Sequence, residues 1–143
     1  MGLQFESLIL NNRQMIWKIL NIPPEEIICD NPYFQNTTKL HQGCQIDYLI
    51  QTRFNTLYII EIKFLQKEIT TSIIQEMQEK IKRLSLPKYF SYRPVLIHVN
   101  GVNEEVSDSN FFAKIINFGD LLKPEFTTEK LKSLLERDFL FFA

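Results

Sequence analysis

Three charged side chains lie in two segments that otherwise have the composition of buried strands. Asp47 belongs to residues 44–52, and Glu61 and Lys63 belong to residues 56–64. Taking an ion out of water costs several kcal/mol unless a partner compensates its charge, so such strands rarely carry charges without a reason. Two carboxylates and one ammonium group that meet at one place could hold a divalent cation and act on a phosphate group.

Counting along the chain predicts that the three groups do meet. Residues 53–55 fit a three-residue hairpin loop between the two segments, and Asn55 tolerates a left-handed backbone. A hairpin that is symmetric about the middle of this loop places Asp47 directly opposite Glu61, with Cβ atoms roughly 5 Å apart. Lys63 lies two residues beyond Glu61 and therefore points to the same face. A register slip of one residue would separate the three groups.

The same charges could instead form the solvated side of a hairpin. The second segment argues against this alternative, because Leu57 and Ile59 share the face of Glu61 and Lys63. The opposite face carries apolar side chains only, which are Tyr58, Ile60, Ile62 and Phe64. A strand that is apolar on both faces is usually covered on both faces. We therefore expect this strand to be mostly buried and its charged residues to lie at one end, where they face a cleft.

Asp47, followed after a gap of thirteen residues by Glu61-x-Lys63, resembles the core motif of the PD-(D/E)XK nuclease superfamily. The proline that gives the motif its name is absent, and Ile46 precedes Asp47, a substitution that the superfamily tolerates. The resemblance implies an α/β fold with a restriction-endonuclease-like αβββαβ core and a central mixed sheet.

We expect a single nuclease-like domain over residues 1–143. Its core would extend over about residues 3–99, and a C-terminal helical extension would follow over about residues 100–143.

The resemblance also implies a reaction, the hydrolysis of a phosphodiester bond in DNA. Asp47 and Glu61 would hold Mg²⁺ or Mn²⁺, which prefer a few carboxylates together with water and substrate phosphate. The backbone carbonyl of Ile62 would add a metal ligand. Lys63 would orient the attacking water or stabilise the charge of the transition state.

Two further residues are candidates for the same site on the basis of the resemblance. A glutamate on the first helix often completes the acidic site in this superfamily, and Glu6 lies among apolar neighbours there. Some of its families carry a glutamine on the second helix and a tyrosine four residues later; here Gln78 is followed by Lys82. For both candidates, an ordinary helix-surface residue remains the alternative.

A closer resemblance is to the C-terminal domain of a family of prokaryotic P-loop ATPases. The stretches that carry it are residues 43–47, 61–63, 78–83 and 93–101. The chain has no Gly-x-x-x-x-Gly-Lys-Ser/Thr phosphate loop, so the ATPase module would be a separate gene product or the missing part of a longer protein. The resemblance implies such a module as a partner, beside DNA.

Composition limits the class of protein. The chain has 143 residues, of which 45% are hydrophobic, and it contains twelve phenylalanines, which is enough for one globular domain with a real core. No apolar run has the length of a membrane span, and no signal peptide is present. We therefore expect a cytoplasmic protein that does not associate with a membrane. The net charge of −1 is poor for an independent nucleic-acid binder, so DNA binding would need a local basic patch or a partner. A homodimer is left open.

Hydrophobic periodicity and turn residues predict the remaining elements. Helices are expected over residues 3–20, 69–85 and 128–138, with Thr70 or Thr71 as the N-cap of the second. Further strands are expected over residues 26–35, 94–99 and 111–118, and Pro32 would place the first at an edge or break it. An acidic loop is expected over residues 103–110.

Two questions stay open in the sequence. The densest basic region is either a solvated helix face or a surface that follows phosphates; it comprises Lys80, Lys82, Arg83, Lys88 and Arg93. The chain as a whole is either a nuclease or a non-catalytic interaction or regulatory domain that keeps the nuclease fold, because a fold does not establish an activity. The intact Asp47, Glu61 and Lys63 favour the enzyme, and the near-neutral charge favours the alternative.

Overall fold

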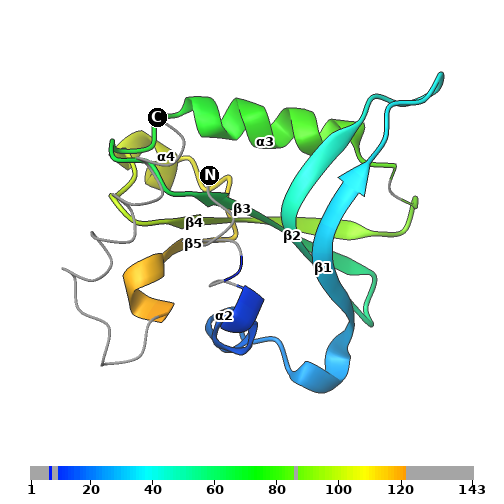
Figure 1. Cartoon of the computed structure of the whole chain (residues 1–143), viewed down its shortest axis with the longest axis horizontal. Coiled ribbons are helices and arrows are strands. Elements are labelled where there is room, and N and C mark those ends of the chain that lie inside the picture. Colours follow the sequence, from blue (N-terminus) through cyan, green and yellow to red (C-terminus); the bar gives the residue numbers. More distant parts are fainter. Residues whose placement is uncertain (1–6, 8–9, 86, 122–143) are drawn as a thin grey trace.

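The computed structural model describes Ser7 and residues 10–85 and 87–121, with only the backbone at positions 120 and 121. One mixed sheet of five strands in the order β1-β2-β3-β4-β5 forms its centre (Figure 1). The strands are β1 (Ile27–Gln35), β2 (Cys44–Thr52), β3 (Thr56–Lys63), β4 (Ser91–His98) and β5 (Lys114–Asn117). Neighbouring strands run antiparallel from β1 to β3 and parallel from β3 to β5.

Helices cover both faces of this sheet. They are α2 (Arg13–Ile19), α3 (Ser72–Arg83) and α4 (Glu104–Asp108), with 3-10 turns η1 (Pro24–Glu26) and η2 (Phe118–Leu121). Helix α3 connects β3 to its parallel neighbour β4 and lies along one face, whereas α2 packs on the other (Figure 1). This α/β arrangement agrees with the predicted fold class.

Strand β3 contributes to the hydrophobic core on both faces, as its alternation predicts. Leu57 and Ile59 pack with Ile73, Met77 and Leu96 on the side of α3. On the side of α2, Ile60 and Ile62 of the strand belong to a second cluster with Tyr48, Ile16 and Val95. The solvated-hairpin alternative is therefore wrong for β3, and a charge on the α3 side of this strand is surrounded by core.

The β2–β3 hairpin has the predicted register. The ladder pairs Thr52 with Thr56 and continues to the pair Tyr48–Ile60, so the next positions along the two strands are Asp47 and Glu61. Asn55 has a positive φ of 55° at the end of the loop, the left-handed backbone that asparagine tolerates.

Strand β2 contains a β-bulge at Asp47. Asn31 of β1 pairs with Leu49, and Tyr33 pairs with Ile46, so two residues of β2 oppose the single residue Pro32. Proline has no N–H to donate to a ladder and is compatible with such a position on an edge strand. The bulge moves Ile46 to the α3 side of the sheet, where Leu49 also packs, and it ends the regular pairing next to the charged residues.

Several predicted boundaries differ from the structure. The described part of the first predicted helix has a turn at Asn12 before α2, and α3 begins at Ser72 instead of residue 69. Thr71 is the N-cap of α3, but its side chain makes no capping hydrogen bond. The predicted acidic loop contains α4, because the Asn103 side chain accepts a hydrogen bond from the Glu105 N–H and caps this short helix. The strand predicted near residues 111–118 is β5, and the helix predicted over 128–138 lies outside the described residues.

Candidate active site

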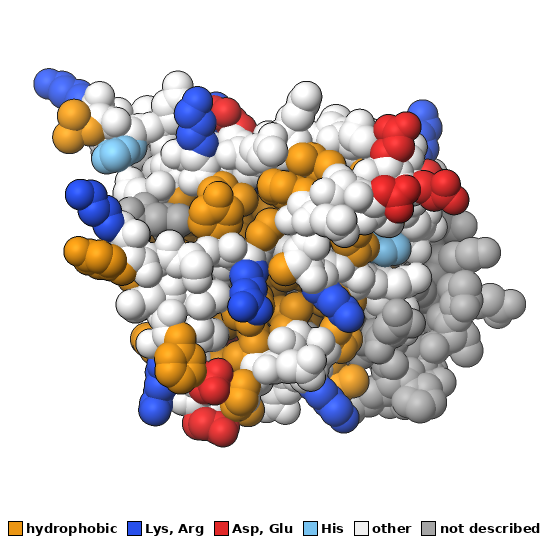
Figure 2. Space-filling view, turned by 180° about the vertical axis from the view of Figure 1, so that it is seen from behind, with side chains coloured by type: hydrophobic (Ala, Val, Ile, Leu, Met, Phe, Trp, Pro, Cys, Tyr) orange, Lys and Arg blue, Asp and Glu red, His pale blue; other side chains and the backbone are white. Residues whose placement is uncertain are grey.

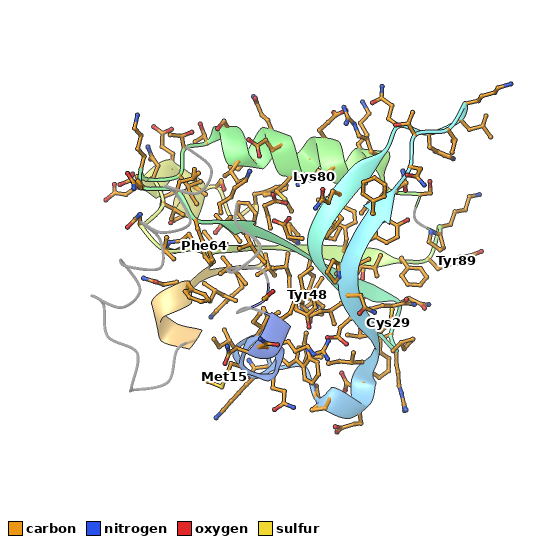
Figure 3. The ribbon with its side chains drawn as sticks, viewed as in Figure 1. Met15, Cys29, Tyr48, Phe64, Lys80 and Tyr89 are labelled. Carbon is orange, nitrogen blue, oxygen red and sulfur yellow. The ribbon has the colours of Figure 1, made fainter. Side chains whose placement is uncertain are left out.

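A polar pocket of about 330 Å³ opens beside the end of β3, between the bulged part of β2 and helix α3. Residues from all three elements and from the segment after β3 line it; they are Gln45, Asp47, Glu61, Ile62, Lys63, Phe64, Leu65 and Lys80. Figure 3 shows Lys80 on α3 above the sheet, next to β2. The structure thus brings the predicted residues Asp47, Glu61, Ile62 and Lys63 to one place.

The bulge and a backbone hydrogen bond position Asp47. Beyond the last ladder pair, the Ile62 N–H donates to Asp47 Oδ2 at 2.8 Å, so the carboxylate takes the place of a carbonyl of the neighbouring strand. This bond holds one oxygen of Asp47 against β3 and places the carboxylate beside Glu61. The side chain is half-buried, so its second oxygen can still meet a ligand or water in the pocket.

Glu61 is the buried acid of the site, with 3% of the residue exposed. Lys80 Nζ donates to both of its carboxylate oxygens, at 3.0 Å and 2.8 Å, and Lys63 Nζ lies 3.8 Å from Oε1. Burial, and after it the negative charge of Asp47, raises the pKa of Glu61 to about 7 although both lysines act in the opposite direction. Glu61 can therefore change its charge near neutral pH.

Lys63 lies at the mouth of the pocket. Its ammonium group is 3.2 Å from Glu76 Oε2 on α3 and 3.8 Å from Glu61 Oε1, and about a third of its side chain, 30%, is exposed. The Glu76 carboxylate is itself 49% exposed, so this ion pair is weak and screened by water. Lys63 can turn toward an anion that enters the pocket without a large loss of stability.

Lys80 is a member of the site that the sequence interpretation missed. It belongs to the densest basic region of the sequence, but it lies three residues after Met77 and four before Leu84, which are both buried against the sheet. This helical spacing could have indicated that Lys80 faces inward. Gln78, the residue predicted from this helix, is exposed and does not line the pocket, because it lies about 100° around the helix from Met77. Glu6 lies outside the described residues.

The oxygen donors of the pocket fit a magnesium or manganese ion. Mg²⁺ is usually held by one or two carboxylates and keeps several waters, and the pocket offers the Asp47 and Glu61 carboxylates beside the backbone of Ile62. The described part of the chain contains no group of three or more histidine, cysteine, aspartate or glutamate side chains that could hold a metal. A tetrahedral zinc site made of side chains is thus missing from these residues, whereas a site that relies on water and phosphate is compatible with them.

Two other titratable side chains form hydrogen bonds within the fold, outside this pocket. The Tyr48 hydroxyl donates to Asp30 Oδ2 at 2.6 Å and accepts from Trp17 Nε1 at 2.9 Å, which joins α2 to β1 and β2 on the far side of the sheet (Figure 3). Burial is the main reason why the pKa of Tyr48 is raised. His98 is buried and accepts a hydrogen bond from the Gly101 N–H at 3.2 Å.

Comparisons with known proteins support the fold. No family model and no curated protein matches the sequence. The structure is similar to the crystal structure of a repair endonuclease from Pyrococcus abyssi, with 13% identity and a TM-score of 0.50. The match covers 87% of this chain and 48% of that one, so this chain spans about half the length of the endonuclease. A crystal structure of a protein of unknown function is similar at 14% identity with a TM-score of 0.49, covering 87% of this chain and 75% of that one.

The likeness to the repair endonuclease shows that the chain has a nuclease-like α/β fold, in agreement with the fold predicted from the sequence. Among the residues that the structure describes, no helix combines the length and apolar character needed to cross a membrane.

Proposed function

We propose that this chain is a metal-dependent nuclease that hydrolyses phosphodiester bonds in DNA. The observation that carries the proposal is the meeting of Asp47, Glu61 and Lys63 in one pocket at the end of β3, with the backbone of Ile62 between them. The nuclease-like fold supports it as well. Asp47, Glu61 and the Ile62 carbonyl would hold Mg²⁺ or Mn²⁺.

The residues of the pocket supply distinct parts of such a reaction. When bound, a divalent cation would polarise the phosphate and neutralise its charge. The Asp47 carboxylate is already oriented by the Ile62 N–H, and Glu61 is buried. Lys63 can donate to a phosphate oxygen or to the attacking water while the bond from phosphorus to the leaving oxygen breaks. Charge that develops on the phosphate is then stabilised by this ammonium group, and such electrostatic stabilisation is usually a large contribution to catalysis.

Binding to DNA needs positive charge around this pocket, and the basic side chains are widely spread. In Figure 2 they are scattered over the face seen from behind instead of forming one patch. One corner of that view projects and carries basic, apolar and histidine side chains together. Leu40 and His41 line a shallow depression of about 250 Å³ with Lys82 and Arg83 at the end of α3.

Hydrogen bonds of one glutamine side chain hold the connection that lines this depression. The Gln35 side chain donates to the carbonyls of Gln42 and Arg83, at 2.8 Å and 2.7 Å, and accepts from the Ser85 N–H. It therefore fastens the β1–β2 connection to the end of α3. We propose that DNA phosphates follow this surface toward the pocket.

Replacing Lys39, Lys82 and Arg83 together with alanine should weaken DNA binding and make it less sensitive to salt. Each phosphate contact that is lost removes nearly one unit from the slope of log K against log salt, so the slope should flatten by about two to three units. The measurement is a set of fluorescence-anisotropy titrations with a DNA duplex at several salt concentrations. The matched control replaces exposed basic residues elsewhere, namely Lys18, Arg53 and Lys114. If the slope changed equally in both triple variants, the proposal that DNA phosphates follow this particular surface would be wrong.

A partner is part of the proposal. The resemblance to the C-terminal domain of P-loop ATPases leads us to propose that an ATPase module works together with this chain. The net charge of −1 supports a partner that contributes DNA affinity.

One observation favours the second candidate function, a non-catalytic interaction domain. The ion pair between Lys80 and Glu61 compensates the buried carboxylate without a metal. A nuclease fold that had lost its activity could keep such a pair as a structural contact.

Metal-linked stability separates these two functions. Mg²⁺ or Mn²⁺ added to protein in chelator-treated buffer should raise the melting temperature, since a ligand at a hundred times its Kd stabilises the folded state by about 2.7 kcal/mol. Asp47→Asn should stay folded and lose this shift, whereas Asp108→Asn, at an exposed position of α4, should keep it. A plasmid-nicking assay is run on the same samples. A wild type without a metal-linked shift contradicts a metal-dependent nuclease, and a shift without nicking favours the non-catalytic domain.

A further inference from the structure

Lys80 is held over the pocket by the packing of α3. Ile73, Met77 and Leu84 of the same helix face are buried against the sheet, which fixes the backbone from which the lysine extends. Its side chain is 26% exposed, so its stem is largely covered while one side can still reach solvent. The helix thus presents one ammonium group directly to the Glu61 carboxylate.

The contact occupies the oxygens that a metal would need. Lys80 Nζ bonds to both Oε1 and Oε2 of Glu61, and one oxygen of Asp47 already accepts from the Ile62 N–H. A cation that took either oxygen of Glu61 would share that oxygen with the Lys80 ammonium group. It would also come within a few ångströms of a positive ammonium group, and two like charges at that distance repel each other.

We propose that Lys80 is a built-in competitor of the divalent cation. It holds Glu61 while the site is empty of metal and must release this carboxylate before the cation can bind. Lysine suits this role, because its ammonium group is a single mobile charge on a flexible stem and can turn to solvent when it is displaced. The inference rests on the proposed metal site and adds to it a control on metal affinity.

The competition has two consequences that do not depend on catalysis. The pair with Lys80 stabilises the metal-free protein, because Glu61 would otherwise be a buried charge with only the more distant Lys63 near it. The same pair lowers the affinity for metal, because part of the binding free energy is used to separate it. Removal of the ammonium group should therefore change metal-free stability and metal affinity in opposite directions.

The test compares Lys80→Met with Lys82→Met. Methionine keeps the length and the apolar stem of lysine and removes the charge, and Lys82 is exposed on the same helix. Calorimetric titration with Mn²⁺, repeated with Mg²⁺, is run at about pH 7 and about pH 8.5, so that competition by a proton on Glu61 is separated from competition by Lys80. At the higher pH, Lys80→Met should bind Mn²⁺ roughly tenfold more tightly than the wild type and melt at a lower temperature without metal. Lys82→Met should resemble the wild type in both measurements.

The outcomes distinguish this inference from the proposed function. A wild type that binds metal and a Lys80→Met variant that binds it equally or more weakly at both pH values would overturn the competition and leave the metal site standing. If the Lys80→Met variant binds metal and the wild type does not, the competition is supported, and Lys80 blocks the metal site in the wild type. Absence of binding in both proteins overturns the metal site and the competition together. If Lys80→Met does not fold, Lys80→Gln, which keeps a hydrogen-bond donor without the charge, is measured by the same titrations.

Discussion

Glu61→Gln should make the metal-free protein more stable than the wild type at pH 8, and the difference should disappear near pH 4. The pKa of Glu61 is about 7 in the folded protein, against an ordinary value of 4.5. Between these two values the folded state binds more protons than the unfolded state, so the contribution of Glu61 to stability falls as the pH rises through this window. The loss amounts to about 3 kcal/mol above pH 7. Glutamine is neutral at every pH, so the variant does not lose this stability.

Urea unfolding in chelator at several pH values between about 4 and 8 measures this effect. The quantity of interest is the difference in unfolding free energy between the wild type and the variant, because other groups titrate equally in both proteins. Glu68→Gln, at an exposed position, is the control and should show a small difference that changes little with pH. A difference for Glu61→Gln that stays constant over the whole range would show that Lys80 and Lys63 compensate the charge fully.

Lys63→Ala should lose cleavage of DNA by about 10²–10³-fold and keep the stabilisation by metal. The ammonium group at the pocket mouth is not a metal ligand, so its removal leaves the Asp47 and Glu61 carboxylates in place. Its pair with Glu76 is exposed, and loss of such a pair costs at most about 1 kcal/mol of stability. The rate is measured by plasmid nicking under single-turnover conditions, beside the metal-linked melting shift.

The control for this variant is Lys67→Ala, which removes an exposed ammonium group just beyond the pocket residues. Lys67→Ala should cleave DNA like the wild type. If Lys63→Ala also retains its activity, Lys63 is not the group that stabilises the reacting phosphate, and Lys80 is then the remaining lysine that lines the pocket.

The part of the site that lies on the β2–β3 hairpin could be predicted from the sequence because its geometry is local. A short loop ending in Asn55 sets the register, and the register in turn places Asp47, Glu61 and Lys63 by counting. The apolar residues on both faces of β3 indicated that this strand is covered from both sides. These inferences need no knowledge of how distant segments pack.

The remaining parts depend on contacts between segments that are far apart in the sequence. Which helical residue meets Glu61 is decided by the rotation of α3 on the sheet, and this rotation selects Lys80 over Gln78. The bulge at Asp47 arises from the pairing with β1, where Pro32 stands opposite two residues, and counting from the hairpin loop does not reveal it. Helix α4 is too short for its periodicity to be seen, and the Asn103 cap at its beginning was not predicted.

The irregular pairing of β1 also bears on how copies of the chain meet. Strand β1 forms one edge of the sheet, and an exposed edge is a template on which another chain can add a strand and begin to aggregate. Here the pairing shifts register twice, between Ile27 and Cys29 and between Asn31 and Tyr33, and Pro32 offers no N–H to an incoming strand. The opposite edge, β5, is only four residues long. Among the described residues, neither edge presents a long, regular strand, so the arrangement that carries Asp47 also protects the sheet against edge-to-edge association.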